Sequence, residues 1–511
     1  MSRERLLFES LLQPGEDTVA KSGFRRVLDA MGIRADDPRL AESQRVLSAI
    51  DGDRIAPDEF VDVIGPNALL LDRALKKQLV IPDFEEFSRD VRRIFEATRG
   101  NAAGVVADYI PQLGRVDPDQ FGVSICTIDG QRVAVGDTDR PFCVHSACKP
   151  VSYCLALEEH GEEVVHRHIG CEPSGQSFNE LTLNREGRPH NPMINAGAIM
   201  SGALIRSRKP MADRFDHVMD AWRRACGGER PGFSNTMYLS ERQTGDRNFA
   251  LAYYMRENGV FPEGVDLVET LEFYFQCCSI EVTTEAMAVV AATLANGGVC
   301  PLTGERIFGA GTVQKCLSLM DSCGLYDFSG EWAFRIGLPA KSSVSGVIMT
   351  VVPNVLGVCT WSPRLDEHGN SVRGIDFGRE LVRTFNFHNY DSIVGGLHGK
   401  KDPRVLREDV QRSLVVDLCW AASEGDLAGI QRLVLQDAQL DGADYDGRTA
   451  LHLAAAEGRD EIVAYLLEQG VDPAPVDRWG GTPLDDARRR QHTRIAALLQ
   501  AAGTRTASDA A

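Results

Sequence analysis

Paired runs of apolar residues, split by short turns, mark two places in the middle of the chain. The runs are 123–128 with 131–135, and 347–352 with 356–361. Asp129-Gly130 separates the first pair and Pro353-Asn354 the second, which predicts two β-hairpins. Between them, the apolar block 284–294 has the length of a helix and ends in an Asn-Gly-Gly stop signal. Strands far apart in sequence with helices between them predict an α+β domain, in which distant segments close one sheet.

The N-terminal stretch predicts short amphipathic helices, for example over residues 24–31 and 40–50. Residues 51–60 then look like half of an EF-hand. A working calcium loop needs oxygen ligands at alternate positions, a central glycine and a closing bidentate glutamate. Arg54 and Pro57 break that register. We therefore expect an EF-hand-like helical domain that binds no metal.

The C-terminal stretch contains an internal repeat. The sequence ASEG at 422–425 recurs 33 residues later as AAEG at 455–458, and TALH at 449–452 recurs at the same offset as TPLD at 482–485. A period of about 33 residues with a Thr-x-Leu-His-x-Ala pattern is typical of ankyrin repeats, in which each helix pair buries its apolar face on the next. Three repeats fit the available length. His452 is therefore expected to be a structural residue of the repeat.

At 511 residues the chain is too long for one hydrophobic core, because a domain usually holds roughly 100–200 residues. We divide it into an EF-hand-like helical domain at 1–78, an α+β domain at 79–400 and an ankyrin-repeat domain at 401–511. The hydrophobic fraction of 43% is ordinary for a globular protein. A formal net charge of −18 argues against a nucleic-acid or anionic-membrane partner, because such partners need clustered Lys and Arg. The arginine run 488–490 fits a solvated helix face.

The cysteines and the apolar runs predict a compartment. Thirteen cysteines without CxxC pairs indicate reduced, packed thiols instead of a disulfide framework or a zinc site. No run of 18 uninterrupted apolar residues occurs, so we expect no membrane span. Glu4 and Glu9 argue against a presequence at this N-terminus. The expected location is the cytoplasm, or the mitochondrial matrix if a leader has been removed.

Ser146 and Lys149 form an S-x-x-K motif that is followed at once by Pro150. Because proline is tolerated only in the first turn of a helix, the helix that continues through Leu157 must begin near Ser146. A spacing of three places Ser146 and Lys149 on one face, and the helix N-terminus offers free N–H groups to developing negative charge. If Lys149 is desolvated, its neutral amine can take the serine proton. Taken alone, S-x-x-K is a common chance match, and a serine at a helix start is usually only an N-cap.

Longer stretches around this motif resemble one family. They are 141–143, 170–175, 189–198, 240–248, 321–327 and 338–342. These stretches resemble the phosphate-activated glutaminases, serine-dependent amidohydrolases whose catalytic domain is similar to β-lactamases and penicillin-binding proteins. The flanking helical and ankyrin domains also match the long animal-type architecture of that family. The resemblance implies an enzyme that hydrolyses L-glutamine to L-glutamate and ammonia through an acyl-enzyme.

The same resemblance implies roles for individual residues. Ser146 would be the nucleophile, Lys149 its base and Tyr326 a second proton-transfer group. The backbone N–H groups of Ser146 and Val344 would form an oxyanion hole, in which one donor typically contributes ~3 kcal/mol. Glu241 is the natural partner for the substrate ammonium, while amides and phenols can donate to the substrate carboxylate. The residues implied to hold the substrate are Tyr109, His145, Ser146, Asn195, Glu241, Asn248, Tyr274, Tyr326 and Val344.

Two positions depart from the family's pattern. Ser343 stands where the family usually has glycine after Lys-Ser, and a glycine lets the backbone approach a ligand closely. His145 precedes the nucleophile where a glutamine is common, and its side chain would face the substrate. We interpret both as tuning activity. Two other classes stay open: an enzyme acting on β-lactams, which shares the S-x-x-K chemistry, and a catalytically silent scaffold.

Members of this family assemble as dimers of dimers, respond to inorganic phosphate and in some cases form filaments. The resemblance therefore implies a homotetramer that inorganic phosphate activates and that needs no metal or organic cofactor. Segment 175–181 resembles the loop that links the subunit interface to the active site in the family. Ankyrin repeats usually supply a binding surface, so a protein partner is a further expectation.

Overall fold

The computed structural model of this protein describes residues 3–12, 16–175, 180–393, 399–434 and 438–509. The chain forms two compact units, residues 1–393 and 394–511. Their buried apolar residues form one cluster in the N-terminal helices, two on the faces of a central sheet, and one in the C-terminal helices, with a small additional cluster beside the site. Within the described ranges, no helix is both long and apolar enough to span a bilayer.

Short helices and two short strands form the N-terminal part of the first unit. They are α1 (Arg3–Leu11), β1 (Val19–Ala20), α2 (Lys21–Ala30), α3 (Ala41–Ala49), β2 (Arg54–Ile55), α4 (Pro57–Ile64) and α5 (Ala68–Leu75). Arg54 directs its guanidinium to Thr18 and, at 2.8 Å, to the Glu16 carboxylate. A cation therefore stands in the segment where a calcium loop would present oxygen ligands. Over the residues that the structure describes, no group of three or more His, Cys, Asp or Glu side chains is arranged to hold a metal ion.

A five-stranded antiparallel sheet lies at the centre of the first unit, in the order β4–β3–β10–β9–β8. Its strands are β3 (Gly122–Thr127), β4 (Arg132–Gly136), β8 (Ala340–Ser342), β9 (Val347–Val352) and β10 (Leu356–Trp361). Both predicted hairpins are confirmed, and β3 pairs with β10 to join them. Val347 and Met349 belong to one hydrophobic cluster, whereas Ile348 and Val352 belong to the cluster on the opposite face. Because both faces are covered, the strands are apolar at nearly every position.

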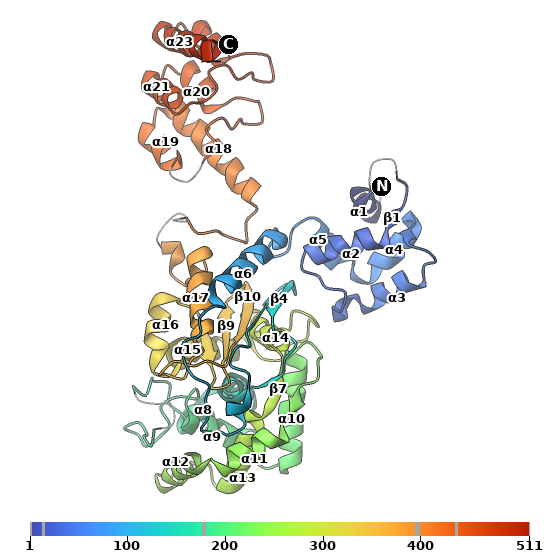
Figure 1. The fold of residues 1–511 in the computed structure, drawn as a ribbon, viewed down its shortest axis with the longest axis vertical. Helices are drawn as coiled ribbons and strands as arrows, with labels where there is room; N and C mark the ends of the chain where they lie inside the picture. Colours follow the sequence, from blue (N-terminus) through green and yellow to red (C-terminus); the bar gives the residue numbers. More distant parts are fainter. Residues whose placement is uncertain (1–2, 13–15, 176–179, 394–398, 435–437, 510–511) are drawn as a thin grey trace. The chain divides into compact units, whose positions relative to one another are not determined.

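Helices cover both faces of the sheet. On one face α14 (Thr284–Ala295) packs against β3, β9 and β10, and it is buried around its whole circumference. On the other face α6 (Phe84–Thr98) contacts β4, and α17 (Val372–Thr384) contacts β10. The helices α6 and α17 also pack on each other, as Figure 1 shows. A sheet with helices packed on each of its two faces agrees with the predicted α+β class.

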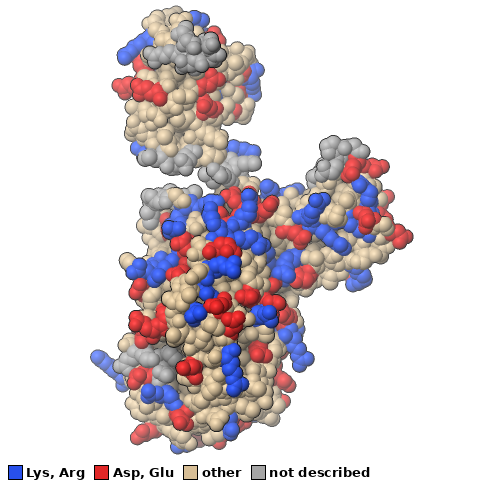
Figure 2. All heavy atoms as spheres, in the orientation of Figure 1, with Lys and Arg blue, Asp and Glu red and all other residues tan. Residues whose placement is uncertain are grey.

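The remaining elements of the first unit pack mainly on the α14 side or link the layers. They are β5 (Phe142–Cys143), β6 (Gly232–Phe233), β7 (Ile280–Val282), α8 (Glu162–His168), α9 (Asn195–Leu204), α10 (Met211–Ala225), α11 (Asn235–Gln243), α12 (Asp246–Glu257), α13 (Leu267–Cys278), α15 (Ala310–Cys323) and α16 (Ser329–Arg335). The three short strands form a second antiparallel sheet in the order β5–β7–β6. Acidic and basic side chains are mixed over the face drawn in Figure 2, so this face carries no continuous basic stripe of the kind that tracks a phosphate backbone.

The second unit is a stack of three helix pairs. The pairs are α18 (Arg407–Glu424) with α19 (Leu427–Val434), α20 (Ala450–Ala456) with α21 (Asp460–Glu468), and α22 (Pro483–Arg489) with α23 (Thr493–Asp509). The first helix of each pair contacts the first helix of the next pair, so that one core runs through the stack. The three repeats predicted from the 33-residue offset are thus confirmed.

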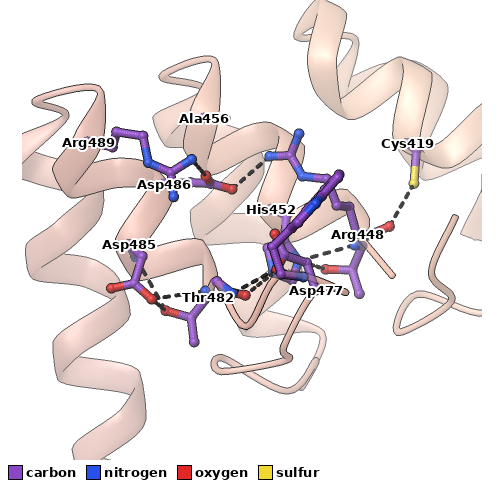
Figure 3. A network of polar contacts seen from close by, with 12 residues as sticks. Cys419, Arg448, His452, Ala456, Asp477, Thr482, Asp485, Asp486 and Arg489 are labelled. Carbon is purple, nitrogen blue, oxygen red and sulfur yellow. Dashed lines mark hydrogen bonds and ion pairs between the residues drawn. The ribbon is translucent and has the colours of Figure 1, made fainter. Parts of the chain in front are cut away.

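A buried polar network joins the second and third helix pairs (Figure 3). Arg448 donates a hydrogen bond of 2.7 Å to the Asp486 carboxylate. His452 is fully buried, with Nδ1 at 3.1 Å from Thr449 Oγ1 and Nε2 at 3.2 Å from the Gly481 carbonyl oxygen. Because both ring nitrogens have partners, His452 is a structural residue, as the repeat pattern predicted.

Candidate active site

Ser146 lies in a short 3₁₀ turn, η4 (His145–Cys148), that leads directly into α7 (Lys149–His160). The helix therefore begins where Pro150 requires, although its first turn is 3₁₀ instead of α. The turn contacts α13, β8 and β9, so the nucleophile candidate stands between the helical layer and the sheet. Ser146 is only 6% exposed and Lys149 only 1%. Both groups are thus removed from bulk water.

Lys149 is a buried amine held by a neutral partner. Its Nζ donates to Asn195 Oδ1 at 2.7 Å. Burial lowers the pKa of Lys149 from its ordinary value to about 8, because desolvation penalises the ammonium more than the nearby Glu241 and thiols favour it. A neutral amine can donate one hydrogen to Asn195 and still present its lone pair. Lys149 is therefore able to act as a base near neutral pH.

Tyr326 contacts Ser146 and lies at the start of the turn η5 (Tyr326–Phe328). Its hydroxyl donates to the Ser342 carbonyl oxygen at 3.1 Å and is also hydrogen-bonded to Ser146. Burial raises the pKa of Tyr326, and the Ser146 hydrogen bond offsets only part of that rise. The phenol is thus protonated at neutral pH and can give a proton. Gly324 makes this approach possible, because a Cβ there would overlap the Ala340 carbonyl oxygen of β8.

Asn195, at the first position of α9, connects three of the predicted residues. Its Oδ1 accepts from Lys149 and, at 3.3 Å, from the Tyr274 hydroxyl, while its Nδ2 donates to Asn248 Oδ1 at 3.0 Å. Asn248 lies on α12 and Tyr274 on α13. Gly197 lets the preceding loop pack against α9, because a Cβ there would overlap the Asn191 carbonyl oxygen. Side chains from three helices thus form one hydrogen-bonded group with Lys149.

Glu241 and His145 form a second polar group beside Ser146. Glu241 is on α11 and 7% exposed, and His145 is 2% exposed. His145 Nδ1 lies 3.5 Å from Glu241 Oε2, and His145 Nε2 and Glu241 Oε2 are both buried without a hydrogen-bond partner. Tyr109 is 54% exposed as a whole residue, yet burial of its hydroxyl end, followed by the Glu241 carboxylate, raises the pKa of its phenol. Tyr109 therefore bounds the group on its open side.

Val344 lies in the turn between β8 and β9 and is 7% exposed. Among the described residues its backbone N–H donates no hydrogen bond, which leaves a donor free for a ligand. Ser343 is fully buried, and its N–H donates to the Val347 carbonyl oxygen at 2.9 Å. Its hydroxyl accepts from Ser345 Oγ at 3.3 Å. The serine at this departure from the family pattern is therefore held by regular contacts.

Lys341 is a site residue to which the sequence reasoning gave no role. It is fully buried on β8 and donates to the carbonyl oxygens of Gly324, at 2.9 Å, and Ser342, at 2.7 Å. Its Nζ also lies 4.5 Å from the centre of the Tyr326 ring. Burial and the charge of Lys149 lower the pKa of Lys341 well below its usual range. Its position in the Lys-Ser motif was the available signal, because S-x-x-K enzymes pair their motif with a lysine on this kind of strand.

The structure brings the predicted site residues together, except that part of the predicted interface loop is not described. Residues 176–179 of the predicted interface loop lie outside the described residues. The residues that meet around Ser146 come from segments spread between positions 109 and 344 of the chain. The result is a buried serine with a desolvated amine, a protonated phenol, a free backbone donor and an unpaired carboxylate beside it.

Comparison with known proteins gives the same picture. A family model described as Glutaminase matches residues 104–390. Models described as Ankyrin repeats (3 copies) and EF-hand domain match residues 418–508 and 3–82. A probable glutaminase from Bacillus subtilis, solved with 6-diazo-5-oxo-L-norleucine, superposes with a TM-score of 0.55 at 30% identity, covering 60% of this chain and 97% of that one. Another probable glutaminase, ybaS, superposes with a TM-score of 0.57 at 35% identity, covering 60% and 98%.

Relatives match over nearly the full length. The mitochondrial liver isoform of glutaminase from Mus musculus is 47% identical over 501 residues, which span 97% of this chain and 83% of that one. Putative glutaminase 3 from Caenorhabditis elegans is 45% identical over 516 residues, spanning 98% and 88%. With the family model covering more than half of the chain, and relatives of this identity along its length, the chain belongs to the glutaminase family, whose enzymes hydrolyse glutamine, and it also carries an EF-hand domain and ankyrin repeats.

Proposed function

We propose that this chain hydrolyses L-glutamine through a covalent acyl-enzyme on Ser146. Lys149 takes the Ser146 proton as Oγ attacks the side-chain amide carbon. The carbon–nitrogen bond then breaks, the amide nitrogen takes up a proton, and ammonia leaves. Water attacks the resulting ester and releases L-glutamate, which restores Ser146. The single observation that carries the proposal is the desolvated Lys149 amine, whose pKa is lowered to about 8 one helical turn from a buried serine.

Tyr326 is proposed to supply the proton to the leaving nitrogen. It is hydrogen-bonded to Ser146, and burial keeps its phenol protonated. Its position is fixed by the hydrogen bond to the Ser342 carbonyl oxygen and by the contact of its ring with Lys341. The backbone N–H groups of Ser146 and Val344 are proposed to receive the oxyanion, which would stabilise the transition state by ~3 kcal/mol for each donor.

The remaining polar groups are proposed to select an α-amino acid. Glu241 has a buried, unpaired oxygen that suits the substrate ammonium. The phenols of Tyr109 and Tyr274 and the amides of Asn195 and Asn248 are proposed to face the α-carboxylate, which accepts hydrogen bonds from such donors. Holding both groups fixes the length of the side chain that can reach Ser146. The site should therefore prefer glutamine over asparagine.

Ammonia release from L-glutamine tests this proposal. We expect Ser146→Ala to lose at least ~10⁴-fold in kcat/KM, since removing a nucleophile abolishes the covalent route. Ser152→Ala is the matched control, because Ser152 is also buried, on the helix α7 that follows Ser146, but lies outside the site. 6-Diazo-5-oxo-L-norleucine should label the native chain covalently and leave the Ser146→Ala variant unlabelled. Equal hydrolysis of asparagine would contradict the assigned substrate contacts, and turnover of nitrocefin would favour a β-lactam-acting enzyme.

The oligomeric state and the activator remain proposals that rest on the family. We propose a homotetramer that inorganic phosphate activates and that can extend into filaments. Light scattering on the purified chain with and without phosphate tests the assembly, and ammonia release over a phosphate titration tests the activation. A monomer of undiminished, phosphate-independent activity would contradict both.

The ankyrin unit is proposed to bind a protein partner. Tyr445 and Trp479, on the turns between helix pairs, are 87% and 64% exposed, and Trp420 on α18 is 69% exposed. Exposed aromatic side chains of this kind are frequent anchors of protein interfaces. A crosslinking group at position 479, followed by mass spectrometry of the captured protein, tests this surface. The Trp479→Ala variant, added in excess, should compete for the captured protein less well than the native chain.

The compartment is proposed to be reducing, either the cytoplasm or the mitochondrial matrix. All thirteen cysteines are free and all but Cys171 are buried, which fits a reducing compartment. The relative from Mus musculus is a mitochondrial isoform. Fractionation of cells that express the full-length chain distinguishes the two compartments.

A further inference from the structure

His145 and Glu241 form a contact that is not closed. The 3.5 Å between His145 Nδ1 and Glu241 Oε2 exceeds the usual range of 2.7–3.2 Å for an N–H···O bond. Glu241 Oε2 and the far nitrogen of His145 are buried without partners. Unpaired buried polar atoms are rare in folded proteins, because each forfeits its hydrogen bonds to water. Two such atoms on neighbouring side chains, next to Ser146, leave hydrogen-bonding capacity that a ligand can use.

The backbone holds His145 in this place. Its φ is +41°, a left-handed conformation that residues other than glycine rarely adopt, because the Cβ then crowds the backbone. Because Ser146 follows immediately in the same turn, the backbone that presents His145 to Glu241 also presents Ser146. The strain is therefore tied to the geometry of the site.

The surroundings of the turn leave Glu241 as the carboxylate in contact with this imidazole. Burial raises the pKa of the phenols of Tyr109 and Tyr274 and of the Cys278 thiol, so these groups are uncharged near neutral pH. Burial lowers the pKa of both lysines in the site. The titratable groups on the elements packed against the turn are Lys149 on α7, Tyr274 and Cys278 on α13, and Lys341 on β8. Cys148 lies in the turn itself, Tyr326 is hydrogen-bonded to Ser146, and Tyr109 lies near Glu241 on α11.

We propose that a proton on His145 competes with the α-ammonium of glutamine for the Glu241 carboxylate, so that this chain loses affinity for its substrate on acidification. A neutral imidazole leaves the carboxylate free for the substrate. An imidazolium closes the 3.5 Å gap and forms a buried ion pair in the position of the substrate ammonium. The inference rests on the proposed role of Glu241 in holding that ammonium. It is specific to a histidine, since the glutamine common at this position in the family carries no titratable proton.

Binding to a variant that cannot react isolates this effect from catalysis. In the Ser146→Ala background, titration calorimetry with L-glutamine between pH 5.5 and 8.0 covers the range in which histidine side chains exchange their proton. We expect the Kd to be constant at the alkaline end and to rise toward tenfold per pH unit at the acidic end. In the double variants with His145→Gln or His145→Asn, the Kd should change by less than about threefold over the same range. Asparagine is included because it tolerates the left-handed backbone.

Two further measurements separate the possible outcomes. Glutaramic acid, which has the amide and the carboxylate but no α-amino group, should bind the Ser146→Ala variant without the acidic loss of affinity. The same pH dependence with and without His145, or none in either, would overturn the inference while leaving the acyl-enzyme proposal intact. By contrast, absence of glutamine binding at every pH, together with absence of ammonia release by the native chain, would overturn the proposed function itself.

Discussion

Two buried histidines of this chain differ in what their ring nitrogens contact. In the ankyrin unit, Nδ1 of His452 meets Thr449 and Nε2 meets the Gly481 carbonyl oxygen. Burial lowers the pKa of His452 and keeps it neutral, which suits those contacts. Beside Ser146, His145 has an unpaired Nε2 and lies 3.5 Å from Glu241 Oε2 through its other nitrogen. The ring of His452 has partners for both nitrogens within its own fold, whereas the ring of His145 keeps one nitrogen without a hydrogen-bond partner.

The difference extends to the charged groups around each histidine. Arg448 and Asp486 pair at 2.7 Å and tie two repeats together. In the catalytic unit Lys149 and Lys341 are both buried among neutral partners, although buried charges are normally paired. The ankyrin network thus stabilises one arrangement of the chain. The candidate active site instead retains desolvated groups, which reduce stability and which we propose supply reactivity.

Replacing the buried amine should separate the two kinds of network most strongly. Lys149→Met keeps the length of the side chain and removes the base, so we expect kcat to fall by roughly 10³-fold or more. The free energy of unfolding should be unchanged or higher, because an apolar side chain suits the buried position better than an amine. Ammonia release and thermal unfolding measure the two effects. The control is Lys315→Met on the surface of α15, and a kcat within tenfold of the native chain would contradict the role of Lys149.

The pH dependence of kcat should show the same amine in titration. Lys149 must be neutral to act as a base, and its pKa in the folded protein is lowered to about 8. We therefore expect kcat to rise about tenfold per pH unit below 8 and to level off above it. Stability should also rise with pH, between about 8 and the unfolded value near 10.4, because the unfolded chain binds the extra proton in that window. A flat profile of kcat from pH 6 to 9 at saturating glutamine would contradict the assignment.

Breaking the ion pair between Arg448 and Asp486 should lower stability and leave activity unchanged, the opposite of the effect of Lys149→Met. Arg448→Ala leaves Asp486 buried with only the weaker approach of Arg489 at 3.4 Å. We expect a loss of about 2 kcal/mol in the stability of the second unit and no change in kcat/KM for glutamine. Arg489→Ala removes the exposed partner of the same carboxylate and should cost less than about 0.5 kcal/mol. Calorimetric unfolding of both variants provides the measurement, and equal losses would show that the buried pair is not special.

The sequence predicted more of the ankyrin unit than of the candidate active site. The ankyrin stack follows from a local repeat, so residues 33 apart in sequence were enough to find it and to make His452 structural. The hairpins and the start of the helix at Ser146 also follow from short-range signals. Other contacts join segments that no sequence pattern links. Examples are the hydrogen bond of Lys149 to Asn195 and the contact of Lys341 with the Tyr326 ring. Resemblance to a family identified most of the site residues, but it could not indicate that His145 and Glu241 would be left unpaired.

Ser343 lies in the site, but its polar groups have hydrogen-bond partners, like those of the ankyrin network and unlike those of His145 and Glu241. Its N–H and hydroxyl both have partners, and its φ is not in the left-handed region, so the serine fits without the glycine that the family usually has. Ser343→Gly should therefore change kcat by less than about threefold. It should lower the free energy of unfolding by about 1 kcal/mol, because glycine loses more backbone entropy on folding and the buried hydroxyl bond is removed. Ser345→Ala removes the other half of that bond and serves as the control for stability. A gain in kcat of tenfold or more in Ser343→Gly would mean that the serine displaces the Val344 donor, and that this position belongs with the strained groups of the site.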